Sequence, residues 1–554
     1  MKTLKIVLLA CFITFLGISC ENFLDEESKI DKTEDLVYNS AEGIESLAAI
    51  SYGYARGFWG KESMVALGEL GTDLWNNAVD PNTAIDFNTY DAMGPEMRWN
   101  IDQALELLYA AINTTNLAIE YVTKTDLIDD ERKLHLECET RFLRAFYNWH
   151  IVETWGPMQL NKEPIRSANT ISRRDSEQEF YEFMLEDVQY CIDNLSPDET
   201  PSSRVTWLAA KAFKARLALY YASEYYRTVV GVDYKGKDYY TIALQEAQDV
   251  IDASAGLGKG LYSNCEDVWD IANSTTLTND EFIWSIDYYD IISPSNFENW
   301  VPTRANEDDD GEPALWDGLF TRSPDNGGGN TQHLWLTPRF YTQTHSVGGP
   351  SLALLLHREA GVHDNYTAES DSILVPVDVG VWYVRYMGYG KFGPTRFTID
   401  LFDETVDERW DATFHTAWYK YPGIVPKYYY SAPDKCLYPN MSVGTETDTA
   451  LFYSKHVLTP EQISWAEGRY KVLDVTNTFE DDGVSPKKSG ESSSTHIYPH
   501  FRKFENTESS LTLPAPNFRD YYSKRDFPIF RMAEMYLIAA EAALETNGSG
   551  AAYS

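Results

Sequence analysis

Apolar residues recur at positions i, i+3, i+4 and i+7 through much of the first half of the chain. This spacing places them on one face of an α-helix. Trp155-Gly156-Pro157 and Asp175-Ser176-Glu177 supply a helix stop and a capped helix start. Successive helices joined by short turns, with no strands between them, indicate antiparallel pairs stacked as an α-solenoid. Six helices are predicted, over residues 35–56, 100–124, 131–154, 176–194, 206–223 and 240–252.

The periodicity changes after about residue 261 to loops and short β-like runs, such as residues 281–286. Irregular segments carried on a rigid frame usually present binding groups, so we expect this region to hold much of the function. A last helix is predicted over residues 527–546. It is expected to be mostly buried, with a single charged stripe formed by Arg531, Glu534, Glu541 and Glu545.

The N-terminus has the pattern of a secretory signal peptide, because Lys2 and Lys5 precede an apolar run over residues 6–18. The run is too short to cross a bilayer, which takes about 20 apolar residues. It ends in Leu-Gly-Ile-Ser-Cys at Cys20, which is similar to a bacterial lipobox. We therefore expect cleavage after residue 19, a lipid on Cys20, and an acidic tether over residues 20–34.

Charge and composition narrow the choice of partner. The 554 residues include 46 Lys and Arg against 85 Asp and Glu, for a net charge of −39. Such a surface repels phosphate backbones, so no nucleic-acid partner is expected. Aromatic residues make up 14% of the chain, with 15 Trp and 37 Tyr. Most of these rings are expected in the core, but exposed ones suit an uncharged, hydroxyl-rich ligand such as a sugar.

Cysteine usage is low for a chain of this length. Once Cys11 leaves with the signal and Cys20 carries lipid, too few cysteines remain for a disulfide-built scaffold. Whether any of them pair is left open by the sequence. The four that remain are Cys138, Cys191, Cys265 and Cys436.

Five passages share their order and spacing with one known family. They are residues 20–25, the Glu-Thr-Arg-Phe-Leu-Arg-Ala-Phe-Tyr run at 139–147 with its Trp-Gly-Pro turn, residues 173–197, residues 204–220, and residues 527–542. Together they resemble the SusD/RagB family of outer-membrane lipoproteins of Bacteroidetes. The resemblance implies a mainly α fold of tetratricopeptide-like helix pairs with a large irregular ligand-binding region.

The resemblance also implies an organisation and a partner. It places a helical scaffold at 35–260, a loop-rich ligand-binding region at 261–526, and a helix that returns to the scaffold at 527–554. It implies a surface receptor that closes like a lid over a SusC-like TonB-dependent transporter and delivers oligo- or polysaccharides to it. The family continues past this last helix, so the sequence is expected to be truncated after Ser554.

A sugar site needs aromatic platforms beside amide or carboxylate groups. Residues 71–77 supply Trp75, Asn76 and Asn77 in a loop, and the resemblance places a binding loop near this point. For Trp75, simple coverage of the scaffold is an equal alternative. Further ligand-binding candidates in the Gly-, Asn- and Pro-rich region are Trp300, Trp316 and Trp335.

Motifs for catalysis and metal binding are incomplete. Residues 308–312 lack the full calcium-loop frame, and the G-x-G-x-x-G match at 388–393 is followed by Pro394 rather than by a helix. His496 and His500 lack the H-E-x-x-H motif. No catalytic residue, cofactor or metal is predicted. Glycan capture is the leading hypothesis. The alternatives are a peptide-binding member of the family, a surface glycoside hydrolase with two carboxylates in a cleft, and a structural partner of the transporter.

Overall fold

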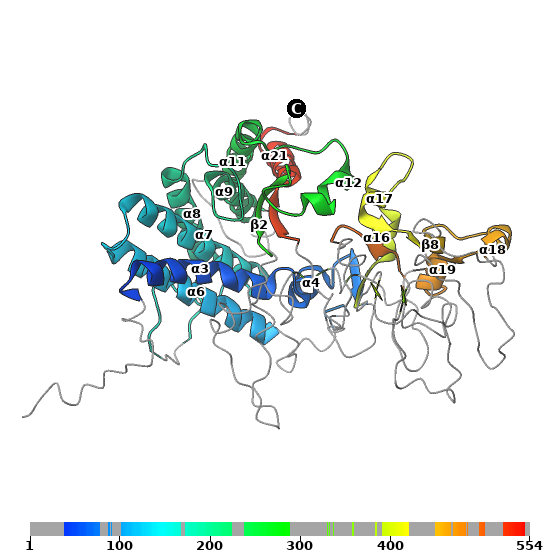
Figure 1. The fold of residues 1–554 in the computed structure, drawn as a ribbon, viewed down its shortest axis with the longest axis horizontal. Helices are drawn as coiled ribbons and strands as arrows, with labels where there is room; N and C mark the ends of the chain where they lie inside the picture. The colour runs from blue at the N-terminus through cyan, green and yellow to red at the C-terminus, as the bar shows by residue number, and fades with distance from the viewer. Residues whose placement is uncertain are drawn as a thin grey trace, which may run out of the picture.

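The computed structural model of the chain contains a helical scaffold and a second body of short helices and strands (Figure 1). The scaffold is mainly α, as predicted. The structure describes residues 38–77, 87–88, 90, 101–167, 172–223, 238–288, 330, 332, 336, 357–358, 383–384, 391–419, 449–466, 469–483, 485, 498–504 and 525–548.

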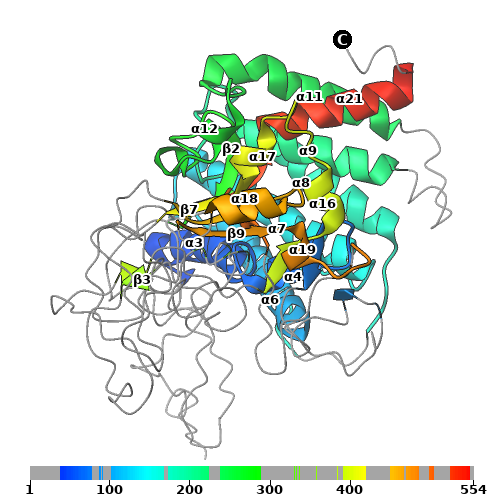
Figure 2. The same cartoon turned by 90° about the vertical axis from the view of Figure 1, so that its right-hand side faces the viewer.

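The scaffold helices pack on one another in chain order, from the first to the sixth of the long helices. The last helix, α21 (Met532–Asn547), packs on the sixth and fifth of them, and Figure 2 shows it lying along α11. This sequential packing is the arrangement expected of stacked helix pairs. The earlier helices are α3 (Ala41–Phe58), α4 (Glu62–Glu69), α6 (Ile101–Lys124), α7 (Asp130–Trp155), α8 (Glu177–Asn194), α9 (Trp207–Ala222) and α11 (Tyr239–Ser254).

Side-chain caps set the starts of these helices. Ser40 accepts a hydrogen bond from the Gly43 N–H at 3.0 Å, so α3 begins at Ala41 rather than near residue 35. Ser176 and Glu179 form a reciprocal capping box at the start of α8. Gly156 follows the last residue of α7 with a φ of +72°, a conformation that glycine adopts without a steric penalty. The five other long helices that were predicted in the first half begin and end within two residues of their predicted bounds.

The expectation of no strands within the first half is wrong. A short strand, β1 (Trp75–Asn77), follows α4 and pairs antiparallel with β5 (Phe392–Pro394). Neither α4 nor β1 was predicted. The pairing joins segments more than 300 residues apart in the chain, and no local periodicity carries that information.

The start of the predicted last helix is also wrong. Residues 527–531 form β11 (Phe527–Arg531), which pairs antiparallel with β2 (Phe282–Ile286), and the helix begins only at Met532. Tertiary pairing outweighs helical periodicity here. Of the four charged residues that were expected on one stripe, Arg531 therefore lies in the strand and pairs with Glu281 at 2.9 Å.

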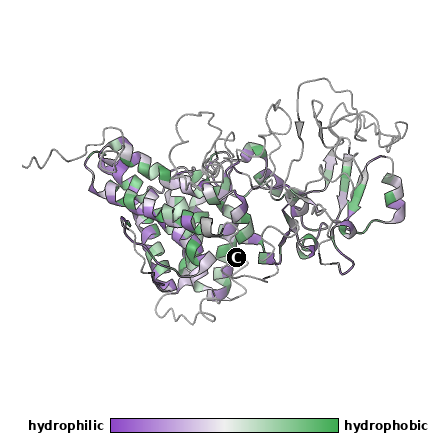
Figure 3. Ribbon diagram, turned by 90° about the horizontal axis from the view of Figure 1, so that it is seen from below, coloured by the Kyte–Doolittle hydropathy of each residue, from purple (hydrophilic) through white to green (hydrophobic). Residues whose placement is uncertain are grey.

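Helix α21 is less buried than expected, because it packs on the scaffold along one side. Met535, Ile538 and Ala542 are buried, whereas Tyr536 and Leu537 are exposed. Figure 3 shows apolar and polar residues alternating around the scaffold helices, the pattern of helices that each bury one face.

Aromatic side chains dominate the scaffold core. Trp284 from β2 is fully buried and packs edge-on against Phe142 and Phe146 of α7, with ring centroids 5.0 and 5.3 Å away. Phe530 of β11 stacks on the same indole at 6.0 Å. The strand pair is thereby joined to the helices.

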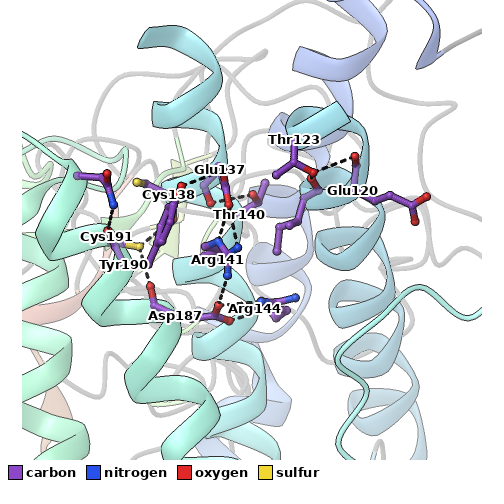
Figure 4. Close-up of polar contacts among 12 residues, drawn as sticks. Glu120, Thr123, Glu137, Cys138, Thr140, Arg141, Arg144, Asp187, Tyr190 and Cys191 are labelled. Atoms are coloured by element: carbon purple, nitrogen blue, oxygen red, sulfur yellow. Dashed lines mark hydrogen bonds and ion pairs between the residues drawn. The ribbon is translucent and has the colours of Figure 1, made fainter. Parts of the chain in front are cut away.

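A buried polar network links α7 to α8 (Figure 4). Asp187 of α8 accepts hydrogen bonds from Arg141 at 2.9 Å and from Arg144 at 2.7 and 2.8 Å. Arg144 also donates to the Asn116 amide oxygen of α6 at 2.8 Å, so one guanidinium joins three helices. Arg141 and Arg144 belong to the run at residues 139–147, whose two arginines therefore hold the scaffold together.

The second body contains a three-stranded sheet in the order β7–β8–β9, with β7 and β8 antiparallel and β8 and β9 parallel. Trp410, Phe414 and Trp418 lie in its core. Its strands are β6 (Phe414–His415), β7 (Ala417–Tyr419), β8 (Thr449–Ser454), β9 (Lys471–Asp474) and β10 (His500–Phe501), and its helices are α16 (Arg396–Asp400), α17 (Arg409–Thr413), α18 (Pro460–Ala466) and α19 (Val475–Thr478). The remaining described elements are η2 (Ala255–Leu257), α12 (Cys265–Val268), η3 (Ile271–Asn273), β3 (His357–Arg358) and β4 (Tyr383–Val384).

Three of the remaining cysteines are free thiols. Cys138 and Cys191 are buried, and the Cys191 thiol donates to the Cys138 carbonyl at 3.1 Å. Cys265 is half-buried, while Cys20 and Cys436 lie outside the described residues. Among the described helices, none is long and apolar enough to cross a membrane.

Candidate functional site

The loop at residues 71–77 is fixed to a distant part of the chain. Beyond the pairing of β1 with β5, the Thr395 N–H and the Thr398 hydroxyl donate to the Leu74 carbonyl at 3.0 and 2.6 Å. The Thr395 hydroxyl also donates to the Asp73 carbonyl. These contacts hold the loop against the first turn of α16 and give it a defined backbone geometry.

The three residues predicted in this loop differ in accessibility. Trp75 is only 7% exposed, and its indole packs edge-on against Phe501 with ring centroids 5.2 Å apart. Asn77 is also buried, and its N–H donates to the Asn88 amide oxygen at 3.1 Å. Asn76 between them is half-buried. In this structure Trp75 supports the loop from beneath, and Asn76 is the member of the three with an accessible side chain.

Trp300, Trp316 and Trp335 lie outside the described residues. Their role in ligand binding stays a prediction.

Two exposed aromatic residues that were not predicted from the sequence adjoin this loop. Tyr90 is 66% exposed, and its hydroxyl donates to the Gly71 carbonyl. Phe397 is 53% exposed and lies between Thr395 and Thr398, the two residues that bind the Leu74 carbonyl. We call residues 71–77 with Tyr90 and Phe397 the loop surface.

The backbone of the loop surface is tightly constrained. Gly71 has a φ of +79°, and a Cβ atom there would lie 2.5 Å from the Phe87 carbonyl oxygen and 2.7 Å from the Tyr90 hydroxyl. Tyr90 itself has a φ of +56°, which is uncommon for a residue with a side chain. Backbone strain of this kind is often found at functional sites.

Two carboxyl groups of α4, the helix that precedes the loop surface, have raised pKa values. Burial raises the pKa of Glu69, at the end of α4, to about 7, although Lys503 acts in the opposite direction. Burial also raises the pKa of Glu62, which pairs with Lys391 at 2.5 Å. At neutral pH a carboxyl group with a pKa near 7 both donates and accepts hydrogen bonds. Exposed rings, an amide and a carboxyl group such as that of Glu69 suit an uncharged polyol ligand.

Family comparisons agree with the fold. Residues 22–219 match a family described as "Starch-binding associating with outer membrane", and residues 357–554 match the SusD family. The chain belongs to the SusD/RagB family, which confirms the assignment made from its five sequence passages.

Two curated relatives match about half of the chain. A SusD-like protein P25 of Formosa agariphila is 22% identical over 300 residues, which cover 51% of each protein. A SusD-like protein of Bacteroides ovatus is 25% identical over 277 residues, 50% of this chain and 48% of the relative. The matched part thus spans about half the length of these relatives.

Two solved structures share the architecture over most of the chain. A laminarin-binding SusD-like protein superimposes with a TM-score of 0.55 and 14% identity, covering 93% of this chain and 82% of the other. A SusD superfamily protein of Parabacteroides distasonis gives a TM-score of 0.55 with 15% identity, covering 92% and 76%. At this identity the likeness establishes the mainly helical fold.

Proposed function

We propose that the protein is a surface glycan-binding lipoprotein and that the loop surface contacts the glycan. The observation that carries the proposal is the pair of exposed rings, Tyr90 and Phe397, that adjoin a hydrogen-bonded loop with an accessible Asn76. Membership of a family described as starch-binding supports a carbohydrate ligand, and so does the laminarin-binding relative of similar fold.

The physical fit is direct. A pyranose ring has apolar C–H faces and a rim of hydroxyl groups, so it can cover an aromatic ring while its hydroxyls bond to an amide. Because the loop backbone is held by Thr395, Thr398 and Tyr90, little ordering is required on binding. Because the rings are already held in place, little conformational entropy is lost when the glycan binds, and more of the contact energy contributes to affinity.

Truncating either ring is expected to weaken glycan binding about fivefold, since an aromatic contact is worth about 1 kcal/mol. Tyr90→Ala with Phe397→Ala should weaken it about 25-fold if the two rings act independently. Calorimetry with soluble laminarin and starch would measure these changes. Tyr90→Phe keeps the ring but loses the hydrogen bond to Gly71, so it should weaken binding less than Tyr90→Ala does. Tyr536→Ala removes an exposed ring from α21 and should change nothing.

The alternatives give different results in the same assays. Unchanged glycan affinity in the double variant would place the site elsewhere. Binding of peptides alone would favour the peptide-binding alternative, and release of reducing sugar would favour a hydrolase. Co-purification with a transporter but no ligand binding would favour a purely structural partner.

The proposal extends to location and delivery. A lipid on Cys20 would hold the protein on the outer membrane beside a SusC-like TonB-dependent transporter, to which it passes the glycan. Cys20→Ala should move the protein from the membrane fraction to the soluble fraction in cells without the transporter, with its glycan affinity unchanged. Cys265→Ala, at a free thiol in the folded body, should remain in the membrane. Membrane retention of Cys20→Ala would contradict the anchor.

A further inference from the structure

A cavity of about 500 Å³ lies on the scaffold where α7 and α9 end. Its wall includes Glu153 and Gly156 at the end of α7, Tyr220 in the last turn of α9, Glu177 at the start of α8, and Glu541 of α21. The volume falls within the range of roughly 300–1,000 Å³ that small-molecule sites occupy. None of the described wall residues belongs to the loop surface, so this cavity is a separate site.

The wall of the cavity is negatively charged. Glu153, Glu177 and Glu541 line it, and the described lining residues include no Lys, Arg or His. α7 and α9 end there with partial negative charge on their last carbonyl groups, whereas α8 begins there with partial positive charge, so the three carboxylates set the net negative sign. Burial raises the pKa of Glu177, and the Glu153 carboxylate raises it further. A cation in the cavity would relieve this repulsion.

Glu177 supplies separate evidence for a ligand. The residue is 9% exposed, and its Oε2 atom is buried with no hydrogen-bond partner within the described part of the chain. Ser176 and Glu179 form the capping box of α8, and the Glu177 carboxylate is not part of that box. A buried acceptor of this kind usually has a partner in the complete assembly.

We propose that this cavity binds the primary ammonium group of a small hydroxylated amine, such as an amino sugar. An ammonium group has three N–H donors, enough for the Glu177 carboxylate, for Glu153 and for a helix carbonyl. The ring of Tyr220, on the cavity wall, provides an aromatic face for the cation. The site does not depend on the loop surface or on the function proposed for it.

An organic cation suits the cavity better than a metal ion. Among the described residues, no three His, Cys, Asp or Glu side chains are arranged to hold a metal. Glu153 already accepts a hydrogen bond from the Tyr181 hydroxyl, so it is not free to act as a bidentate metal ligand. A cavity of this volume also has room for the body of the amine beside its charged group.

A titration of the full chain with glucosamine, followed by ligand-observed NMR and calorimetry, tests the proposal. Glucosamine should bind saturably. Glucose and N-acetylglucosamine, which lack the ammonium group, should bind at least tenfold more weakly. Equal affinity for glucose, the absence of saturable glucosamine binding, or displacement of glucosamine by equimolar calcium would overturn the proposal.

Variants locate the binding site. Glu177→Gln should weaken glucosamine binding at least tenfold, whereas Glu186→Gln, at an exposed position on the same helix, should leave it unchanged. Glu541→Gln, also exposed, should weaken binding two- to threefold and serves if Glu177→Gln does not fold. If Glu177→Gln folds and binds glucosamine as tightly as the unchanged protein, the proposed site is wrong. If Glu177→Gln does not fold, unchanged glucosamine affinity in Glu541→Gln gives the same conclusion. Tyr90→Ala should not affect glucosamine, so a failure here is distinct from a failure of the loop surface.

Discussion

Replacing Asp187 with alanine is expected to lower the free energy of unfolding by about 3–5 kcal/mol. The carboxylate is almost fully buried and accepts three hydrogen bonds from Arg141 and Arg144. Removing it leaves the buried Arg144 guanidinium without its charge partner, and that is the main cost. The interaction spans α7 and α8, so both helices should lose stability together.

Urea unfolding followed by circular dichroism would measure this loss. Asp193→Ala changes an exposed carboxylate on the same helix and should alter stability by less than about 0.5 kcal/mol. Asp187→Asn keeps the shape of the side chain but removes its charge. Its free energy of unfolding should lie between those of Asp187→Ala and Asp193→Ala. Equal stability of the Asp187→Ala and Asp193→Ala variants would show that the buried pair contributes nothing.

The helical scaffold could be predicted because its signals are local. Apolar periodicity within 15 to 25 residues sets each helix, and a single side chain such as Ser176 or Thr206 fixes its start. The arginines of α7 were identified only as part of a resemblance. Their partner, Asp187, lies 43 residues from Arg144, and the sequence alone does not indicate the pairing.

The candidate site was predicted only in part, because its geometry depends on contacts between segments far apart in the chain. Residues 71–77 stand out in the sequence as a loop with an aromatic residue and amides, and Asn76 is accessible there. Burial of Trp75 depends on Phe501, and exposure of Phe397 next to the loop depends on strand pairing across more than 300 residues. Long-range pairing of short segments leaves no periodic pattern, so neither outcome could be read from the sequence.

The same limit applies to residues 527–531, which continue the apolar pattern of the following helix yet form a strand. Their partner is β2, and both strands contribute rings to the scaffold core around Trp284. This indole also donates to the Ser203 carbonyl at 3.1 Å, just before α9. Trp284 therefore connects the strand pair to two scaffold helices.

Trp284→Ala is accordingly expected to lower the free energy of unfolding by about 3–5 kcal/mol, through lost burial and the cavity left behind. Trp284→Phe fills part of the space and should lose less, and Trp465→Ala removes an exposed indole from α18 and should change little. Hydrogen exchange would show where stability is lost. Because β11 leads directly into α21, protection should fall in both elements and in β2. If α21 kept full protection while β2 and β11 lost theirs, its contacts with α11 and α9 alone would hold it in place.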